Sequence, residues 1–190
     1  VSSMQPVFTP PPADPALYAA YSIKGKDYTA HALGRRDFTP GQANAVNAID
    51  MSLTNPGRIL LADPGDFTLK GAATLTGTLV VVGDLKFHQD TILTAVANYP
   101  ALVVTGDIVA DKDEAKLTVI GSVICGGSIL DRGKTSVFLS VRGACTAGTF
   151  DLSRGDGNYI FQWDPAYSVF WNLAESGAAY PATLLDWKEN

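Results

Sequence analysis

The sequence predicts a mainly β protein, built as a parallel, right-handed β-helix of about four to five coils. The first observation is an internal repeat, because Gly83, Gly106, Gly127 and Gly148 each end a short apolar run, at spacings of 23, 21 and 21 residues. Strand-like repeats of this length are typical of solenoids. An ordinary β-sandwich is the alternative, although the connections lack the Asn-Gly or Asp-Gly turns that tight hairpins favour.

The second observation is that apolar residues fall into columns when the repeats are aligned on these glycines. Three columns share the parity of the glycine and therefore point to one face of their strands. Their members are Leu79, Leu102, Val123 and Ala144; Val81, Val104, Cys125 and Thr146; and Leu85, Ile108, Ile129 and Phe150. The intervening column is also mostly apolar and comprises Val80, Val103, Ile124 and Cys145. Strands that are apolar on both faces predict a sheet covered on both sides, with the outer cover supplied by the chain's own termini or by a partner.

Further strands complete each coil. Gly65-Asp66-Phe67 matches the repeat pattern less completely and predicts one more coil, or rung, of the solenoid before the four repeats. Additional strands are expected at residues 73–76, 92–96, 117–120 and 137–141. Two or three strands in each coil of roughly twenty residues are typical of a parallel β-helix. The repeat region is therefore assigned to residues 58–152.

Residues 1–57 precede the repeats and form a proline-rich arm followed by a capping helix. Asp14 and Pro15 predict the start of a short helix over residues 16–21. Thr39-Pro40-Gly41-Gln42 is a capping-box pattern, and the helix that it opens is expected to run to about Leu53. The apolar face of that helix would contain Val46, Ile49 and Leu53, before Asn55-Pro56-Gly57 ends it. We expect this helix to cover the open end of the first coil.

Residues 153–190 follow the repeats and are rich in aromatic side chains. These are Tyr159, Phe161, Trp163, Tyr167, Phe170, Trp171, Tyr180 and Trp187. The preferred interpretation is a C-terminal cap that packs on the solenoid. The alternative is a carbohydrate-binding platform, for which Trp163 and Trp171 are the candidate ligand-binding residues.

Composition limits the classes of function. The net charge of −5 argues against a nucleic-acid partner, because phosphate binding needs clustered lysine and arginine. The only basic pair, Arg35-Arg36, is interpreted as part of a solvated loop. No apolar run is long enough to span a bilayer. A chain that begins with valine is explained by a cleaved signal, a removed N-terminal anchor or trimming.

Few residues suggest catalysis. His31 and His88 could each act as a general base, but no nucleophile motif accompanies them. Asp84 and Asp107 share one column and could in principle share a proton or a metal, although aspartate after glycine is also ordinary turn chemistry. We therefore expect no enzymatic activity and no cofactor.

Two further groups of residues are candidate sites. Asp111, Asp113 and Glu114 form a carboxylate-rich corner that could bind calcium, with a solvated loop as the preferred alternative. Cys125 and Cys145 fall on neighbouring rungs but in adjacent columns, which places them on opposite faces and disfavours a disulfide. A one-residue bulge near residues 142–147 would reverse that conclusion.

Several segments together resemble the C-terminal region of PilX-type pilus-assembly proteins and related exported bacterial proteins. They are residues 74–85 (TLTGTLVVVGDL), 92–108 (ILTAVANYPALVVTGDI), 120–129 (IGSVICGGSI), 184–189 (LLDWKE) and the proline-led residues 12–21 (PADPALYAAY). The apolar N-terminal helix with which members of that family usually begin is not in this sequence. The resemblance implies an exported protein of the cell surface, periplasm or extracellular space, and it supplies no catalytic residues.

The leading hypothesis is therefore a non-enzymatic, exported structural or adhesive protein, associated with a pilus or the cell surface. The first alternative is a self-assembling filament subunit, in which solenoid ends or the proline-rich arm contact another copy. The second alternative is a β-helical protein that binds or degrades carbohydrate. The expected partners are other proteins or further copies of the chain, and a surface glycan is a further candidate.

Overall fold

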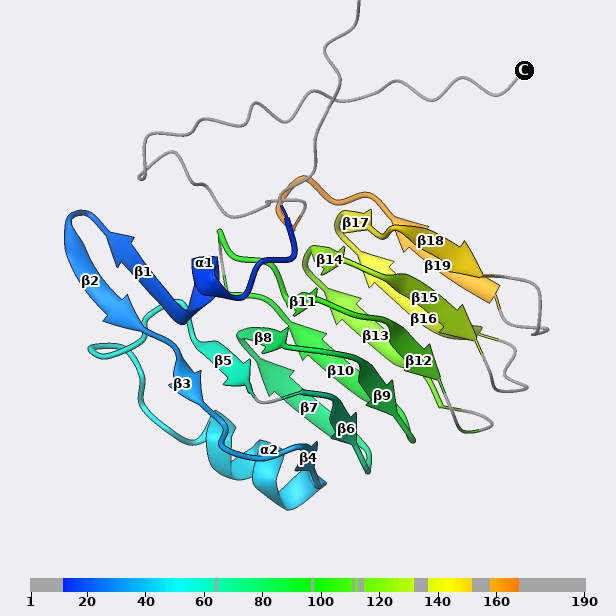
Figure 1. Cartoon of the computed structure of the whole chain (residues 1–190), viewed down its shortest axis with the longest axis horizontal. Coiled ribbons are helices and arrows are strands. Elements are labelled where there is room, and N and C mark those ends of the chain that lie inside the picture. The colour runs from blue at the N-terminus through cyan, green and yellow to red at the C-terminus, as the bar shows by residue number, and fades with distance from the viewer. Residues whose placement is uncertain are drawn as a thin grey trace, which may run out of the picture.

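The structure is a computed structural model, and it describes residues 12–63, 65–96, 98–110, 112, 115–131, 137–151 and 158–167 of the 190-residue chain. Three parallel sheets wind into a β-solenoid (Figure 1). We number these sheets I, II and III in the order in which the chain visits them, and their strands are given below. The chain contributes a strand to sheet I, then to sheet II, then to sheet III, and returns to sheet I one coil further on. This arrangement confirms the predicted fold class and excludes the β-sandwich.

The strands of each sheet follow one another along the solenoid axis. Sheet I contains β3 (His31–Ala32), β5 (Ile59–Ala62), β8 (Thr78–Val81), β11 (Leu102–Val104), β14 (Val123–Cys125) and β17 (Cys145–Thr146). Sheet II contains β4 (Asp37–Phe38), β6 (Phe67–Leu69), β9 (Leu85–Phe87), β12 (Ile108–Ala110), β15 (Ser128–Asp131) and β18 (Thr149–Asp151). Sheet III contains β7 (Ala73–Thr76), β10 (Thr91–Thr94), β13 (Leu117–Ile120), β16 (Val137–Arg142) and β19 (Asn158–Gln162).

The strand register confirms the aligned columns over the first three repeats. Leu79 pairs with Leu102, which in turn pairs with Val123 on the next coil. The predicted early rung is present as β6, where Phe67 pairs with Leu85. Strands β7 and β13 have the predicted bounds, and β10 and β16 differ from them by one or two residues. Patterns of alternating or continuous apolar residues thus located these strands, because each coil repeats the same order of inward-facing and outward-facing side chains.

The inward columns fill the interior of the solenoid. Leu102, Val104 and Ile108 are fully buried in one continuous apolar core that runs through successive coils. Stacking identical positions at the strand spacing lets similar side chains pack directly on one another.

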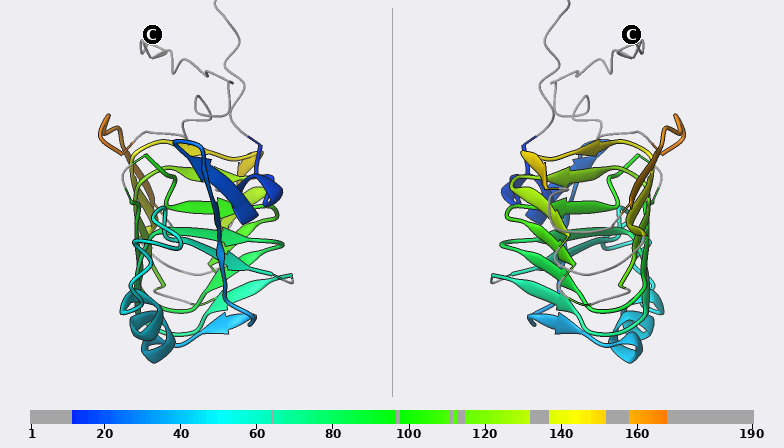
Figure 2. Two further views of the ribbon diagram at one scale, coloured as in Figure 1. Left: turned by 90° about the vertical axis from the view of Figure 1, so that its left-hand side faces the viewer. Right: turned by 90° about the vertical axis from the view of Figure 1, so that its right-hand side faces the viewer.

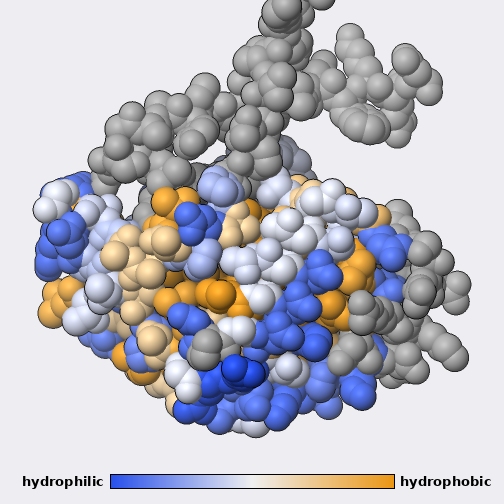
Figure 3. Space-filling model, viewed as in Figure 1, coloured by the Kyte–Doolittle hydropathy of each residue, from blue (hydrophilic) through white to orange (hydrophobic). Residues whose placement is uncertain are grey.

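The outer face of sheet I is covered by the N-terminal part of the chain. Of the two expected covers, the chain's own termini or a partner, the structure shows the first. Helix α1 (Ala16–Ala19) and an antiparallel hairpin of β1 (Ala20–Ile23) and β2 (Lys26–Thr29) precede the solenoid. Tyr18 and Tyr21 pack with Val80, Val103 and Ile124 in a second buried cluster. In the space-filling view, apolar residues gather around α1, and hydrophilic residues dominate the lower edge of the molecule (Figure 3). The outward apolar column therefore serves to attach this segment.

Helix α1 is shorter than expected. It ends at Ala19 rather than Tyr21, and Tyr21 lies in β1. Asp14 does serve this turn, since its Oδ1 accepts a hydrogen bond from the Ala16 N–H (2.9 Å). The extended conformation from Ala20 onward brings the Tyr21 ring onto sheet I. Burial of that ring stabilises the fold more than another turn of helix would.

Helix α2 (Pro40–Asn47) lies at the N-terminal end of the solenoid, where the predicted capping helix was expected (Figure 2). The capping box is present, with the Thr39 N–H donating to Gln42 Oε1 (2.8 Å). Ala43 and Val46 face the core and cover the first coil. The cap is thus built from the residues that the sequence pattern indicated.

The predicted end of this helix at Leu53 is wrong, because α2 ends at Asn47. The Arg58 guanidinium donates to the carbonyl oxygens of Val46 (3.2 Å), Asn47 (3.4 Å) and Ile49 (3.0 Å), which satisfies the last carbonyls of the helix. Two of the three residues on the expected apolar face are exposed, namely Ile49 at 40% and Leu53 at 79%. Between α2 and β5, which begins at Ile59, the chain instead forms turns.

The solenoid strands extend beyond the region assigned to the repeats. Strands β3 and β4 precede residue 58, and β19 pairs in parallel with β16 after residue 152. Residues 158–162 of the expected aromatic cap therefore form one more rung of sheet III. The rest of that cap, apart from residues 163–167, lies outside the described residues.

Candidate functional site

A ladder of aspartates occupies the corner between sheets I and II. The Asp84 N–H donates to Asp66 Oδ1 (3.0 Å), and the Asp107 N–H donates to Asp84 Oδ1 (2.9 Å). The Ser128 N–H continues the series by donating to Asp107 Oδ1 (2.7 Å). Each carboxylate thus holds the backbone of the next coil. Asp84 and Asp107, the candidates for a shared proton or metal, have a structural role in this geometry.

The repeat glycines allow the coils to approach closely at this corner. The Gly106 N–H donates to the Gly83 carbonyl oxygen (2.9 Å), and the Gly127 N–H donates to that of Gly106 (3.0 Å). A Cβ atom on Gly106 would collide with Asp84 Oδ1 and lie 2.9 Å from the Gly83 carbonyl oxygen. The Gly-Asp repeat is therefore explained by this corner, without reference to a ligand.

The two histidines are not brought together. His31 lies in β3, the edge strand of sheet I, and His88 follows β9 in sheet II, where its N–H donates to the Leu69 carbonyl oxygen (3.0 Å). Among the residues that the structure describes, no group of three or more histidine, cysteine or acidic residues could hold a metal ion. The calcium candidates Asp111, Asp113 and Glu114 lie outside the described residues.

The two cysteines lie on the same face of sheet I, which corrects the predicted register. Cys145 pairs with Val123 rather than Ile124, because two residues at positions 125 and 126 oppose a single residue in the next coil. Both thiols are free. Cys125 and Cys145 are displaced by one coil and two residues, so their Cα atoms are roughly 8 Å apart, from strand geometry. That separation exceeds the ~7 Å that a disulfide can bridge without backbone movement.

The thiols are also protected from ionisation. Burial raises the pKa of Cys125 to about 11 and that of Cys145 to about 12, and for Cys145 the nearby Cys125 adds to the increase. Because the thiolate is the reactive form, both cysteines are poor nucleophiles at neutral pH. They behave as small core residues.

An aromatic cluster lies at the C-terminal end of the solenoid. Phe150 contacts Tyr159 and Phe161 edge to face, with ring centroids 6.2 and 5.7 Å apart. These three residues continue inward columns, pairing with Ile129, Leu139 and Val141 on the previous coil. The partners are buried, whereas Phe150 is 38% and Phe161 50% exposed. Among the described residues, no further coil covers these rings.

Trp163, one of the two carbohydrate candidates, follows β19 and has a side chain that is 54% exposed. Trp171 lies outside the described residues. The turn after Trp163 is fixed to the body of the solenoid, since Arg142 forms a salt bridge with Asp164 (2.7 Å) and lies over the Tyr167 ring.

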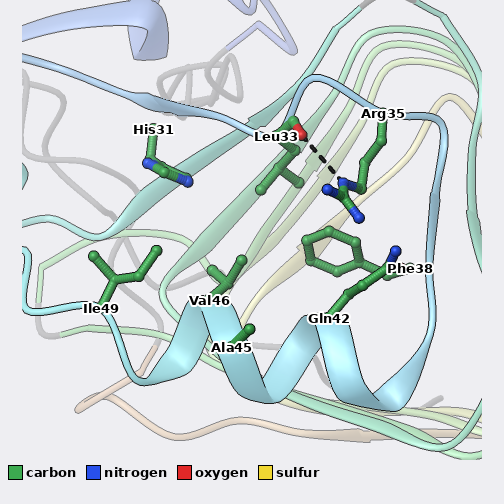
Figure 4. Close-up of a pocket in the computed structure, with 8 residues that line it drawn as sticks. All are labelled: His31, Leu33, Arg35, Phe38, Gln42, Ala45, Val46 and Ile49. Atoms are coloured by element: carbon green, nitrogen blue, oxygen red, sulfur yellow. Dashed lines mark hydrogen bonds between the residues drawn. The ribbon is translucent and has the colours of Figure 1, made fainter.

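A pocket of about 240 Å³ lies at the opposite end, between the chain segment of β3 and β4 and helix α2 (Figure 4). Its apolar lining comprises Leu33, Phe38, Ala45, Val46 and Ile49. Its polar lining comprises His31, Arg35 and Gln42. None of the eight lining residues is acidic.

Sequence reasoning missed this pocket. Arg35 does lie in an exposed bend, as the interpretation of Arg35-Arg36 predicts, but the sequence does not indicate that this bend lies beside α2. Ile49, expected on the buried face of a longer helix, is instead exposed at the pocket. The pocket exists because α2 ends before Ile49 and because the segment from His31 to Phe38 crosses over the helix. The one available signal was an arginine between two apolar residues, Leu33 and Phe38, before a capping box.

None of the helices in the described residues is long and apolar enough to cross a membrane. Searches of protein-family models, of curated proteins and of solved structures find no match to this chain.

Proposed function

We propose that this chain is a non-enzymatic structural or adhesive protein, exported to the cell surface or a pilus, that acts through protein contacts at the end of its solenoid. The observation that carries the proposal is the aromatic end of the described solenoid, where Phe150 and Phe161 are exposed beside the partly buried Tyr159. The exported location rests on the resemblance to PilX-type proteins alone.

The end of the solenoid has two properties of a contact surface. It exposes aromatic side chains that would be core residues if another coil followed, and contiguous exposed apolar area is typical of interaction sites. In the described part of the chain, β17, β18 and β19 each pair on one side only, and sheet edges can pair with another chain. A partner could bury the rings and extend the sheets together.

A self-assembling subunit is the second candidate function, and the same surface favours it. Two copies that meet at this end would each bury the other's exposed rings. The contact would be isologous if both use the C-terminal end, and it would then close as a dimer rather than a filament.

Light scattering of the purified chain, with electron microscopy of the same sample, separates the two candidates. Assembly that is lost in Phe161→Asp but kept in Ile92→Asp would support self-association through the end. Ile92 is a matched control because its side chain is 41% exposed on the flank of sheet III. A wild-type chain that stays monomeric at high concentration would contradict self-assembly and leave contacts with other proteins.

The non-enzymatic character is tested separately. Incubation with a panel of polysaccharides, followed by measurement of new reducing ends and unsaturated products, should show no turnover. Reproducible cleavage of any of them would contradict the proposal. A glycan array probed with wild type and Trp163→Ala would in turn detect a carbohydrate-binding role.

A further inference from the structure

We propose that the pocket between α2 and the β3–β4 segment binds a small carboxylate with a compact apolar body. This inference is independent of the proposed function, since it concerns the other end of the solenoid. It rests on the combination of a cationic rim, an apolar wall and a lining without acidic residues.

Arg35 is positioned to receive an anion. Its Nε donates to the Leu33 carbonyl oxygen (3.4 Å), and its Cζ lies 6.0 Å from the centroid of the Phe38 ring. These contacts hold the guanidinium over the pocket, as Figure 4 shows. No described residue accepts a hydrogen bond from its two terminal nitrogens, which are the donors that bind a carboxylate in a bidentate manner.

Two other side chains can add donors. Gln42 accepts the Thr39 N–H at its Oε1 atom, which fixes the amide and leaves the Nε2 group as a donor for a ligand. His31 faces the same space from the opposite side of the pocket (Figure 4). The three polar residues therefore surround an apolar space with donors and a positive charge.

The apolar wall selects the rest of the ligand. Leu33, Phe38 and Val46 are buried beneath the pocket, and Ile49 remains 40% exposed beside it. A ligand that covers the exposed Ala45 and Ile49 side chains would remove apolar surface from water, which favours a hydrocarbon or aryl group. The volume of about 240 Å³ is below the ~300–1,000 Å³ of pockets for drug-sized ligands, so a ligand with one ring or a short chain fits best. A cation is disfavoured by Arg35.

The test is a titration of ¹⁵N-labelled full-length chain with 3-phenylpropionate, followed by ¹H–¹⁵N NMR. We expect saturable shifts confined to residues around the pocket. The neutral analogue 3-phenylpropionamide should bind about tenfold more weakly, because it forfeits a hydrogen-bonded ion pair.

Variants assign the effect to the pocket. Arg35→Gln should weaken 3-phenylpropionate by about tenfold, whereas the neighbouring Arg36→Gln, which changes the net charge equally outside the lining, should leave affinity within about twofold. Ala45→Phe, at an exposed position of α2 on the pocket wall, should block binding. Unchanged spectra away from the pocket establish that each variant is folded.

Three outcomes would overturn the proposal. They are the absence of saturable shifts in the wild type, equal affinity for the acid and the amide, and equal losses in Arg35→Gln and Arg36→Gln. The first outcome would show that the pocket does not bind the carboxylate. Either of the other two would show that the Arg35 charge does not contribute to binding.

Discussion

The aspartates that follow the repeat glycines each hold the next coil through one backbone hydrogen bond. A carboxylate acceptor makes such a bond stronger than a neutral one, and the same corner excludes any side chain at the glycine. Residues that resemble a catalytic pair in the sequence are thus accounted for by stacking. At the N-terminal end, by contrast, the Arg35 charge has no such partner among the described residues and is available to a ligand.

A prediction at the residue scale compares two glycines. Gly106→Ala should lower the free energy of unfolding by ~1–3 kcal/mol or more, since its Cβ would overlap Asp84 and the Gly83 backbone. Gly41→Ala, in α2 with open space around its Cβ, should instead raise it by up to ~1 kcal/mol through helix propensity. Urea denaturation measures both. Equal effects at the two positions would contradict the close approach of coils.

Helix α2 protects the edge of sheet III as well as covering the core. Asn47, its last residue, donates from Nδ2 to the Thr74 carbonyl oxygen (2.6 Å) and accepts the Thr76 N–H at Oδ1 (3.1 Å). Its amide thereby replaces the hydrogen bonds of an additional strand along β7. Exposed edges recruit other chains, so this contact also limits association at the N-terminal end.

At the element scale, we predict that Asn47→Ala lowers the free energy of unfolding by ~1–3 kcal/mol, because two edge groups of β7 lose their partners. Asn44→Ala is the control. Asn44 is an exposed residue of the same helix, and among the described residues its side chain forms no hydrogen bond with β7. Thermal unfolding compares the variants. Association of Asn47→Ala at rising concentration, seen by light scattering, would further support the edge-protecting role.

The whole molecule has two apolar layers, one inside the solenoid and one between sheet I and the N-terminal segment. Tyr18 is 1% exposed against Val80 and Val103. The Tyr21 hydroxyl donates to Asn55 Oδ1 (2.7 Å) and accepts the Gly57 N–H (3.1 Å), which fastens the segment to the loop before β5. The two ends of the solenoid also differ. Helix α2 covers the N-terminal end, whereas Phe150 and Phe161 are exposed at the C-terminal end of the described strands.

At this scale, Tyr18→Ala should lower the free energy of unfolding by ~3–5 kcal/mol, as removal of a buried aromatic side chain does. It should also increase binding of the dye ANS, because the outer face of sheet I becomes accessible. Tyr28→Ala, at the margin of the same cluster, should have a smaller effect on both. An unchanged ANS signal in Tyr18→Ala would show that the segment stays in place without this ring.

The sequence alone determined the glycine-aligned repeats, the strands within them and the double burial of sheet I, because a solenoid repeats its pattern at each turn. A glycine, an aspartate and an apolar column therefore recur at visible spacings. Tertiary structure decided the rest. Arg58 ends α2 early, a one-residue offset places Cys145 opposite Val123, and the crossing of residues 31–38 over α2 creates the pocket. These features depend on contacts that occur once, between residues distant in sequence, and such contacts leave no periodic signal.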